Sequence, residues 1–169
     1  MKKVYLIVSF MFLVSAGIIL TACSSDDFSS DDVTWGNLDD YQSNQEGLCN
    51  AWQLIGYGSE SKFHKIAEEY RKESETYGSR FYLIFKSDGT FAGREAVNRI
   101  YGKYSCNAGN IFISEVVGTE IYDKEKDSHE FQWRLLEATH YLINKDGKKL
   151  RLYYSDKEFL FFELIDSQI

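Results

Sequence analysis

Cysteine and histidine are the residue types in this chain best suited to nucleophilic or metal chemistry, and both are scarce. There are three of each: Cys23, Cys49, Cys106, His64, His129 and His140. Zinc sites use Cys and His ligands at short, regular spacings, and no histidine here has a second His or Cys at such a spacing. A Cys–His nucleophile is equally disfavoured, because buried or oxidised thiols are inert. The sequence therefore predicts no catalytic residue, no metal site and no bound cofactor.

The start of the chain has the features of an export signal. Lys2 and Lys3 precede an uncharged, apolar run over residues 4–20, which is the order of a secretory signal peptide. A transmembrane anchor is the alternative, but spanning a bilayer takes about 20 apolar residues, and this run is short and interrupted by small residues. It ends in Leu20-Thr21-Ala22-Cys23, which resembles the lipobox of bacterial lipoproteins. That resemblance implies removal of residues 1–22 and lipidation of Cys23, with the lipid bilayer as partner.

Acidic residues are concentrated after Cys23. Residues 23–46 hold seven acidic residues and no basic one, whereas residues 47–169 hold 19 acidic and 17 basic residues. Nothing here resembles the clustered basic face that nucleic-acid binding needs. Because such a polar stretch does not bury enough apolar surface to fold, we expect residues 23–46 to be a flexible tether. The alternative is an address, since the stretch also resembles the surface-export signal of some outer-membrane lipoproteins.

The remainder, residues 47–169, has the length of one domain and mostly the pattern of short strands. Asp88-Gly89 between two apolar runs is a strong hairpin signal, because glycine accepts a positive φ. About eight strands at regular spacing favour an antiparallel barrel or sandwich. The expected strands are residues 51–57, 80–86, 90–93, 100–105, 111–117, 139–143, 149–154 and 158–164.

Two stretches have helical periodicity instead. Residues 62–77 place apolar side chains at helical spacing between charged ones, which predicts an amphipathic helix. A second helix is expected from residue 127, with Ser128 as its cap and with Phe131 and Leu135 on one apolar stripe. We expect that stripe to close one end of the barrel.

A set of short motifs follows in order along residues 47–164. An opening Trp-Gln-Leu is followed by a Phe-Lys-Ser-Asp-Gly-Thr-Phe hairpin, an Asn-Arg-Ile-Tyr-Gly-Lys-Tyr strand, Gly-Thr-Glu, a helix and two closing apolar strands. This order resembles the META domain, the family of heat-shock HslJ-like lipoproteins. The broader set of lipocalin-like bacterial lipoproteins is the alternative, and the helix after the Gly-Thr-Glu favours META. The positions that carry the resemblance are Trp52, Phe85, Asp88, Gly89, Gly93, Asn98, Gly102, Tyr104, Thr119, Phe131, Leu135, Leu152 and Phe161.

The resemblance implies a lipocalin-like antiparallel barrel with one helix, an envelope location and no established catalytic residues. Many members of the family carry a cysteine pair at places that here hold Val97 and, approximately, Asp123. The bridge of those members is therefore not available. Cys49 and Cys106 remain, in a compartment that permits disulfides, and they either form a substitute bridge or stay as buried free thiols.

Aromatic residues make up 16% of the chain, and two uses are open for them. They line a ligand pocket, or they fill a small barrel whose eight strands leave just enough room for side chains. We expect filling, with Trp52, Phe85, Tyr104, Phe131 and Phe161 in the core.

Three functions are consistent with these features. The first is a non-enzymatic lipoprotein of the outer membrane, facing the periplasm or the cell surface, that contributes to envelope integrity or stress tolerance. The second is a lipocalin-type binder of a small ligand, which a hollow interior would favour. The third is an inhibitor or partner-binding module, which a contiguous exposed aromatic patch would favour.

Overall fold

The structure is a computed structural model that describes residue 33 and residues 35–71, 79–121 and 126–165. The expected signal peptide, residues 1–22, and the expected lipidation site, Cys23, lie outside the described residues. Within the described ranges, no helix has the length and apolar character needed to cross a membrane.

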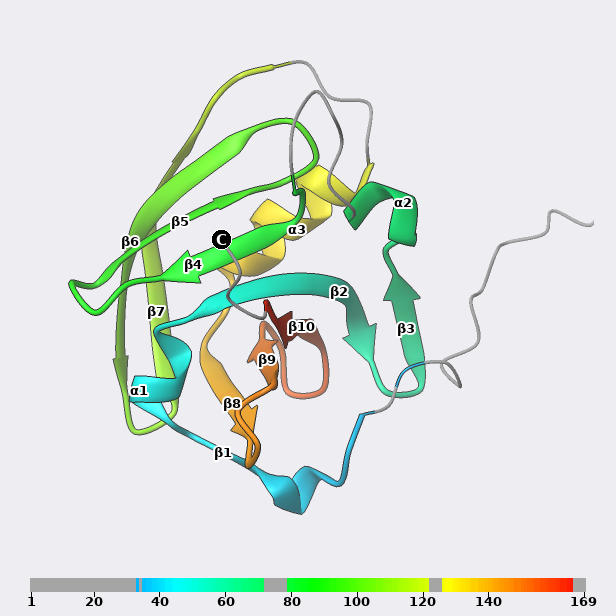
Figure 1. Cartoon of the computed structure of the whole chain (residues 1–169), viewed down its shortest axis with the longest axis vertical. Coiled ribbons are helices and arrows are strands. Elements are labelled where there is room, and N and C mark those ends of the chain that lie inside the picture. Colours follow the sequence, from blue (N-terminus) through cyan, green and yellow to red (C-terminus); the bar gives the residue numbers. More distant parts are fainter. Residues whose placement is uncertain (1–32, 34, 72–78, 122–125, 166–169) are drawn as a thin grey trace, which may run out of the picture.

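Eight antiparallel strands form a closed ring, which confirms the expected mainly β fold (Figure 1). In the described part of the chain, two further strands lie outside the ring: β1 (Tyr41–Gln42) pairs with β8, and β3 (Lys62–Lys65) pairs with β2. Each ring strand pairs with the next, and the last pairs again with the first, in the order β8 (His140–Asn144), β7 (Asn110–Gly118), β6 (Arg99–Asn107), β5 (Thr90–Arg94), β4 (Tyr82–Phe85), β2 (Ala51–Ser59), β10 (Phe159–Leu164) and β9 (Lys149–Tyr153).

The Asp88-Gly89 hairpin forms as predicted, between β4 and β5. The Asp88 carboxylate accepts hydrogen bonds from the backbone N–H of Thr90 at 2.9 Å and from its hydroxyl at 2.6 Å. Gly89 has a φ of +81°, a conformation that side chains disfavour. The turn chemistry thus sets the register in which Phe85 lies opposite Phe91.

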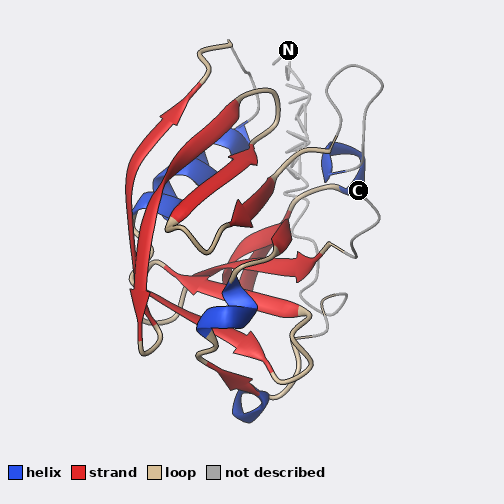
Figure 2. Ribbon diagram, turned by 60° about the vertical axis from the view of Figure 1, so that its left-hand side comes forward, coloured by secondary structure: helices blue, strands red, loops and turns tan. Residues whose placement is uncertain are grey.

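Helices are few and small beside the strands (Figure 2). Among the described residues, the longest helix is α3 (Lys126–Leu136), which confirms the expected second helix; α1 (Gln45–Leu48), α2 (Glu68–Arg71) and a 3-10 turn (Leu38–Asp40) are single turns. Ser128 is not the cap of α3, because the helix starts two residues earlier. Its hydroxyl instead accepts a hydrogen bond from the backbone N–H of Ala96 at 3.4 Å.

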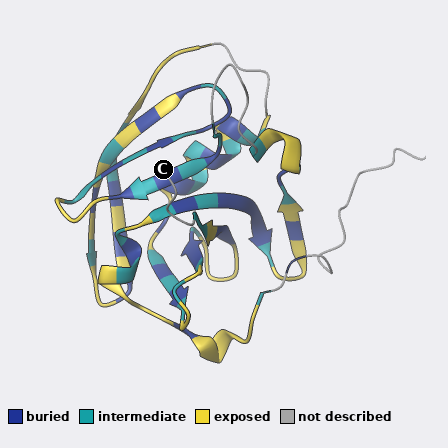
Figure 3. Cartoon of the chain, in the orientation of Figure 1, coloured by how far each residue is buried: buried dark blue, intermediate teal, exposed yellow. Residues whose placement is uncertain are grey.

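Side chains fill the interior of the ring. One cluster of buried apolar residues draws on all eight ring strands, and Phe131 and Leu135 of α3 add to it. Trp52 is completely buried, and its indole N–H donates to the Leu48 carbonyl at 3.0 Å. Figure 3 shows the alternation of buried and exposed positions along β6 and β7 that results. The interior is therefore a packed core.

The predicted core residues are all buried, but they belong to two clusters. Trp52, Phe85, Tyr104 and Phe131 lie in the interior cluster. Phe161 lies outside it, in a second cluster on the outer wall of the ring, which we call the wall cluster: Val33, Ile55, Phe63, Tyr153, Phe159 and Phe161.

The chain before the ring packs on the outer wall, where a flexible tether was expected up to residue 46. Trp35 covers the wall cluster, with its ring centroid 4.7 Å from that of Phe63 and 5.1 Å from that of Phe161. Tyr41 is buried, and its hydroxyl donates to the Trp35 carbonyl at 2.7 Å. We call residues 35–48 the N-terminal strap. In its described part, the interval expected to be a tether is thus a component of the fold.

The helix predicted over residues 62–77 is wrong for its described part. Residues 62–65 form β3, and only residues 68–71 are helical. The Ser59 hydroxyl accepts a hydrogen bond from the Lys62 backbone N–H at 3.2 Å and tightens the turn into β3. Phe63 then packs under Trp35, and this tertiary contact outweighs the helical spacing of a short segment.

Replacing Trp52 with alanine should strongly destabilise the domain, because it empties the centre of the interior cluster. The expected loss is about 3–5 kcal/mol in the free energy of unfolding, measured by urea denaturation. The control is Trp133→Ala on α3, whose side chain is 54% exposed; it should change stability by less than about 1 kcal/mol. Equal effects of the two substitutions would contradict the packing described above.

Candidate functional site

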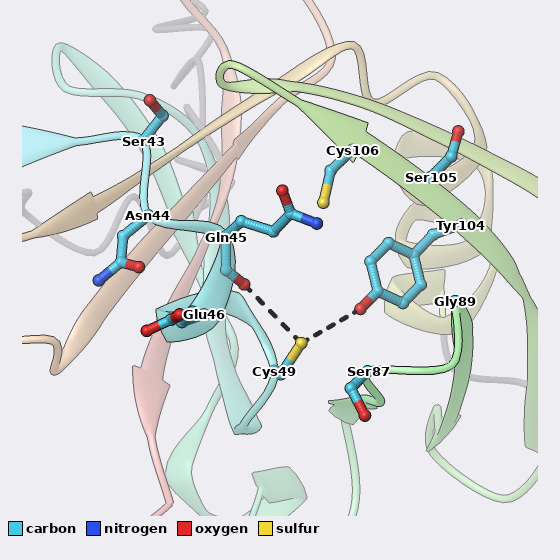
Figure 4. A pocket seen from close by; sticks show the side chains of 10 residues that line it. All are labelled: Ser43, Asn44, Gln45, Glu46, Cys49, Ser87, Gly89, Tyr104, Ser105 and Cys106. Carbon is cyan, nitrogen blue, oxygen red and sulfur yellow. Dashed lines mark hydrogen bonds between the residues drawn. The ribbon is translucent and has the colours of Figure 1, made fainter.

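A polar cleft between the N-terminal strap and β6 holds both cysteines that the structure describes; we call it the thiol cleft (Figure 4). It has a volume of about 690 Å³, within the range of ligand sites. It is lined by residues 43–46, Cys49, Ser87, Gly89 and residues 104–106.

Three elements position the thiol cleft. The strap contributes α1, whose first turn is capped by the Asn44 side chain, which accepts a hydrogen bond from the Gly47 backbone N–H at 3.0 Å. Cys49 follows directly and is the C-cap residue of α1. The β4–β5 hairpin contributes Ser87 and Gly89, and β6 contributes Tyr104 and Cys106.

Tyr104 links these elements chemically. Its hydroxyl donates to the Lys86 carbonyl at 2.7 Å and lies 3.4 Å from the Cys49 sulfur. Because the one hydroxyl proton is engaged with Lys86, the single thiol proton of Cys49 is shared between the Tyr104 hydroxyl oxygen and the Gln45 carbonyl, which lies 3.7 Å from the sulfur. Burial, together with the Cys49 contact, raises the pKa of Tyr104. Tyr104 is therefore uncharged, and its hydroxyl connects β6 with α1 and with the hairpin.

Cys106, the second thiol of the cleft, is a poor nucleophile. Burial raises the pKa of Cys106 above its usual 9.0, against a hydrogen bond from Tyr141 that lowers it. Burial likewise raises the pKa of Tyr141 to about 12. A thiol that stays protonated at neutral pH reacts slowly, and no histidine is among the residues that line the cleft.

The sequence left open whether Cys49 and Cys106 form a disulfide or stay as free thiols. Both are free and half-buried in the structure, so the substitute bridge is not formed. They nevertheless share one cleft, although 57 positions separate them in the sequence.

A second cleft, of about 570 Å³, lies where the β5–β6 loop meets the chain leading to α3; we call it the Asn98 cleft. It is lined by Glu95, Asn98, residues 118–121, Ser128, His129 and Gln132.

Asn98 and Thr119, both positions of the META resemblance, meet in the Asn98 cleft. The Asn98 side-chain oxygen accepts from the Thr119 hydroxyl at 2.9 Å and from the Ile121 backbone N–H at 2.7 Å. Its side-chain nitrogen donates to the Ile121 carbonyl at 3.0 Å. One amide thus fixes the segment after β7, and its role in the structure is that of a clamp.

Most other motif positions also have structural roles. Phe85, Phe131, Leu135 and Leu152 fill the interior. Gly93 and Gly102 permit close packing: a Cβ on Gly93 would lie 2.2 Å from the Tyr82 carbonyl oxygen, and one on Gly102 would lie 2.5 Å from the Phe91 ring.

His64 and His140 take part in local contacts. The described part of the chain contains no group of three or more His, Cys, Asp or Glu side chains placed to hold a metal ion. His64 contacts the Asp127 carboxylate at 2.9 Å, and the Tyr57 hydroxyl donates to the same oxygen at 2.8 Å. His140 stacks on Tyr153 with ring centroids 4.4 Å apart.

Asp127 is the charged centre of the contact with His64 and Tyr57. Burial alone would raise its pKa, but the hydrogen bonds from His64 and Tyr57 outweigh burial and lower it. These contacts tie β2 and β3 to the first turn of α3.

Arg151 is a charged residue that is almost completely buried. Strand alternation puts it on the outer face of β9, where exposure is expected, yet it is only 1% exposed. Its guanidinium donates to Glu60 at 2.7 Å and lies 4.5 Å from the Tyr41 ring and 4.7 Å from the Phe159 ring. The strap covers Arg151, and no local sequence pattern indicates that the strap packs on β9.

The geometry defines a class: a small antiparallel ring domain with a filled interior, one supporting helix and polar clefts on its surface. Within that class, the family model of the META domain matches residues 47–165. The chain belongs to the META domain family.

Two solved structures share the fold. The chain is similar to a protein from Burkholderia xenovorans, solved by NMR, with a TM-score of 0.58 and 15% identity over 79% of this chain and 95% of that one. It is also similar to a DUF4847 family protein from Bacteroides vulgatus ATCC 8482, with a TM-score of 0.50 and 18% identity over 69% of this chain and 92% of that one. No curated protein matches the sequence.

Replacing Asn98 with alanine should destabilise the domain by about 1–3 kcal/mol, because it removes the three hydrogen bonds of a buried side chain to Thr119 and Ile121. The measurement is the midpoint of urea unfolding. The matched control is Asn110→Ala at the exposed start of β7, where the side chain makes one long contact of 3.4 Å with the Asn107 carbonyl. Indistinguishable midpoints for the two variants would contradict the clamp.

The lowered pKa of Asp127 predicts acid sensitivity. A carboxylate whose pKa is lower in the folded state contributes stability above its unfolded pKa, near 3.8, and that contribution is lost as the pH falls through the folded value. The melting temperature should therefore fall more steeply for the wild type than for Asp127→Asn when the pH drops below about 4. Asp156→Asn in the exposed β9–β10 turn should melt like the wild type throughout. Parallel curves for wild type and Asp127→Asn would count against the contact.

Proposed function

We propose that this protein is a non-enzymatic lipoprotein, anchored through Cys23 in the outer membrane, whose META domain serves the integrity or stress tolerance of the envelope. The observation that carries the proposal is the sequence Leu20-Thr21-Ala22-Cys23 after an apolar run. A lipidation signal needs that order, because the thiol receives the lipid and small residues admit the processing peptidase.

The position of the strap supports an anchored domain. Trp35 is clamped on the wall cluster only 12 positions after Cys23. Between Cys23 and Val33, ten residues span at most about 33–36 Å when fully extended. A lipid on Cys23 therefore holds the domain near the membrane surface.

The filled interior supports a role other than that of a carrier of buried ligands. Lipocalin-type carriers enclose the ligand within the ring, whereas here large aromatic residues such as Trp52, Phe85 and Phe162 occupy that space. Binding of a small ligand or a partner is the second candidate function, and the thiol cleft favours it, because the cleft combines sufficient volume with convergent polar groups.

Replacing Cys23 with alanine should abolish lipidation, because the acceptor thiol is lost. The expected result is a precursor that takes up no labelled palmitate in cells and retains the mass of residues 1–22. Cys49→Ala is the matched control, since it removes a thiol that lies in the folded domain; it should be labelled and processed like the wild type. Palmitate incorporation into the Cys23→Ala protein would overturn the anchoring proposal.

A further inference from the structure

We propose that Cys49 and Cys106 are a redox pair, and that a disulfide between them closes the thiol cleft and fastens the N-terminal strap to β6. The proposal rests on the proposed function in one respect only, that the envelope is an oxidising compartment.

The two sulfur atoms project into the same cleft from different elements (Figure 4). Cys49 ends α1 of the strap, and Cys106 lies near the end of β6. Tyr104, which contacts the Cys49 sulfur at 3.4 Å, is two positions before Cys106 on the same strand and therefore shares its face of the sheet. The hydroxyl of Tyr104 thus places Cys49 beside the surface from which Cys106 projects.

The strap and the end of β6 are also in contact at a second point. The β6–β7 turn packs against the strap so closely that a Cβ on Gly109 would lie 3.1 Å from the Cβ of Ser43. Cys49 follows a helix of only four residues. Leu48, the residue before it, is fixed in the interior cluster, and its carbonyl accepts a hydrogen bond from the Trp52 indole at 3.0 Å, so the movement that closes the bond is confined to Cys49 and the side chains of the cleft while the ring strands keep their pairing.

The chemistry is thiol–disulfide exchange with a protein or low-molecular-weight disulfide as oxidant. One cysteine loses its proton to solvent and attacks the oxidant disulfide, which forms a mixed disulfide and releases one thiolate of the oxidant. The second cysteine loses its proton and displaces the other half of the oxidant, which forms the Cys49–Cys106 bond. Two electrons pass to the oxidant, which leaves as two thiols.

Either thiol can form the mixed disulfide, and the other thiol then resolves it. Burial raises the pKa of Cys106, which slows its reaction at neutral pH. The new bond replaces the contact of Cys49 with Tyr104, whereas the hydrogen bond from Tyr104 to Lys86 is retained.

Oxidation then fixes the strap at both ends. Trp35 holds its first end on the wall cluster, and the bond holds its last residues on β6. The cleft between α1 and β6 narrows, because both thiols line it. The reduced protein therefore has an open cleft, and the oxidised protein has a closed one.

The test uses the full-length chain with Cys23→Ser, in detergent, so that only two thiols remain. The protein is equilibrated with reduced glutathione or with glutathione disulfide and examined by intact mass and thiol alkylation. We expect oxidation to remove two hydrogens from the monomer, to reduce the alkylatable thiols from two to none, and to raise the melting temperature by roughly 10 °C.

The control variants are Cys49→Ser and Cys106→Ser, each in the same Cys23→Ser chain. Neither should change its melting temperature by this amount on oxidation, and each should accumulate a mixed disulfide of glutathione at its remaining cysteine. The proposal is overturned if the two-thiol chain keeps both thiols alkylatable, forms only intermolecular dimers, or melts alike in both states. Because this chain lacks Cys23, none of these results depends on lipidation.

Discussion

Closure of the ring depends on β2. This strand pairs along both edges, and its side chains pack into both the interior cluster and the wall cluster. One edge pairs with β10 from Trp52 to Gly58. The other edge pairs first with β4 and then with β3.

Strand β2 has one extra residue, Ile55, relative to β10. This bulge lets β2 pair along both edges while its side chains pack into both clusters. The register of β10 slips there, so that Phe161 and Phe162 lie opposite Gly56 and Leu54. Such a bulge changes which way side chains point: Leu54 enters the interior cluster, and Ile55 joins the wall cluster. Gly56 then lets β3 approach, since a Cβ there would lie 2.2 Å from the His64 carbonyl oxygen.

Burial of Arg151 is the second constraint, and it explains why the strap belongs to the fold. A guanidinium removed from water is costly unless it is paired. Glu60 supplies the opposite charge, and the rings of Tyr41 and Phe159 supply favourable contacts for a cation. Without the strap, Arg151 would lie on the open outer face of β9 and the wall cluster would be exposed to water. The strap and the wall therefore stabilise each other.

Most of the ring was predictable from local pattern, because strand alternation and the Asp88-Gly89 turn act over a few residues. The helix α3 was predictable for the same reason. The failures all involve contacts between distant parts of the chain. Phe63 has helical spacing with its neighbours, but Trp35 and Phe161 draw it into β3, and the position of the strap depends on Arg151 in the same way.

The thiol cleft was only half predictable. The sequence identified Cys49 and Cys106 as candidates for pairing but contained nothing to relate them to Tyr104. That relation requires α1 to fold back onto β6. A cleft formed between a strap and a sheet has no local signal, because each side contributes ordinary polar residues.

The positions that define the family resemblance explain the fold more than they explain an activity. Gly93 and Gly102 allow close strand contacts, Asn98 clamps a loop, and Trp52 and Phe131 fill the interior. Because side chains fill the interior of the ring, function depends on the surface, where the strap, the turns and the clefts lie. These surface parts depend least on the family motif. Cys49 and Cys106 are not among the motif positions, and most of the strap precedes the residues matched by the family model. The family motif therefore accounts for the scaffold, and the strap and the two cysteines of the thiol cleft lie at positions outside that motif.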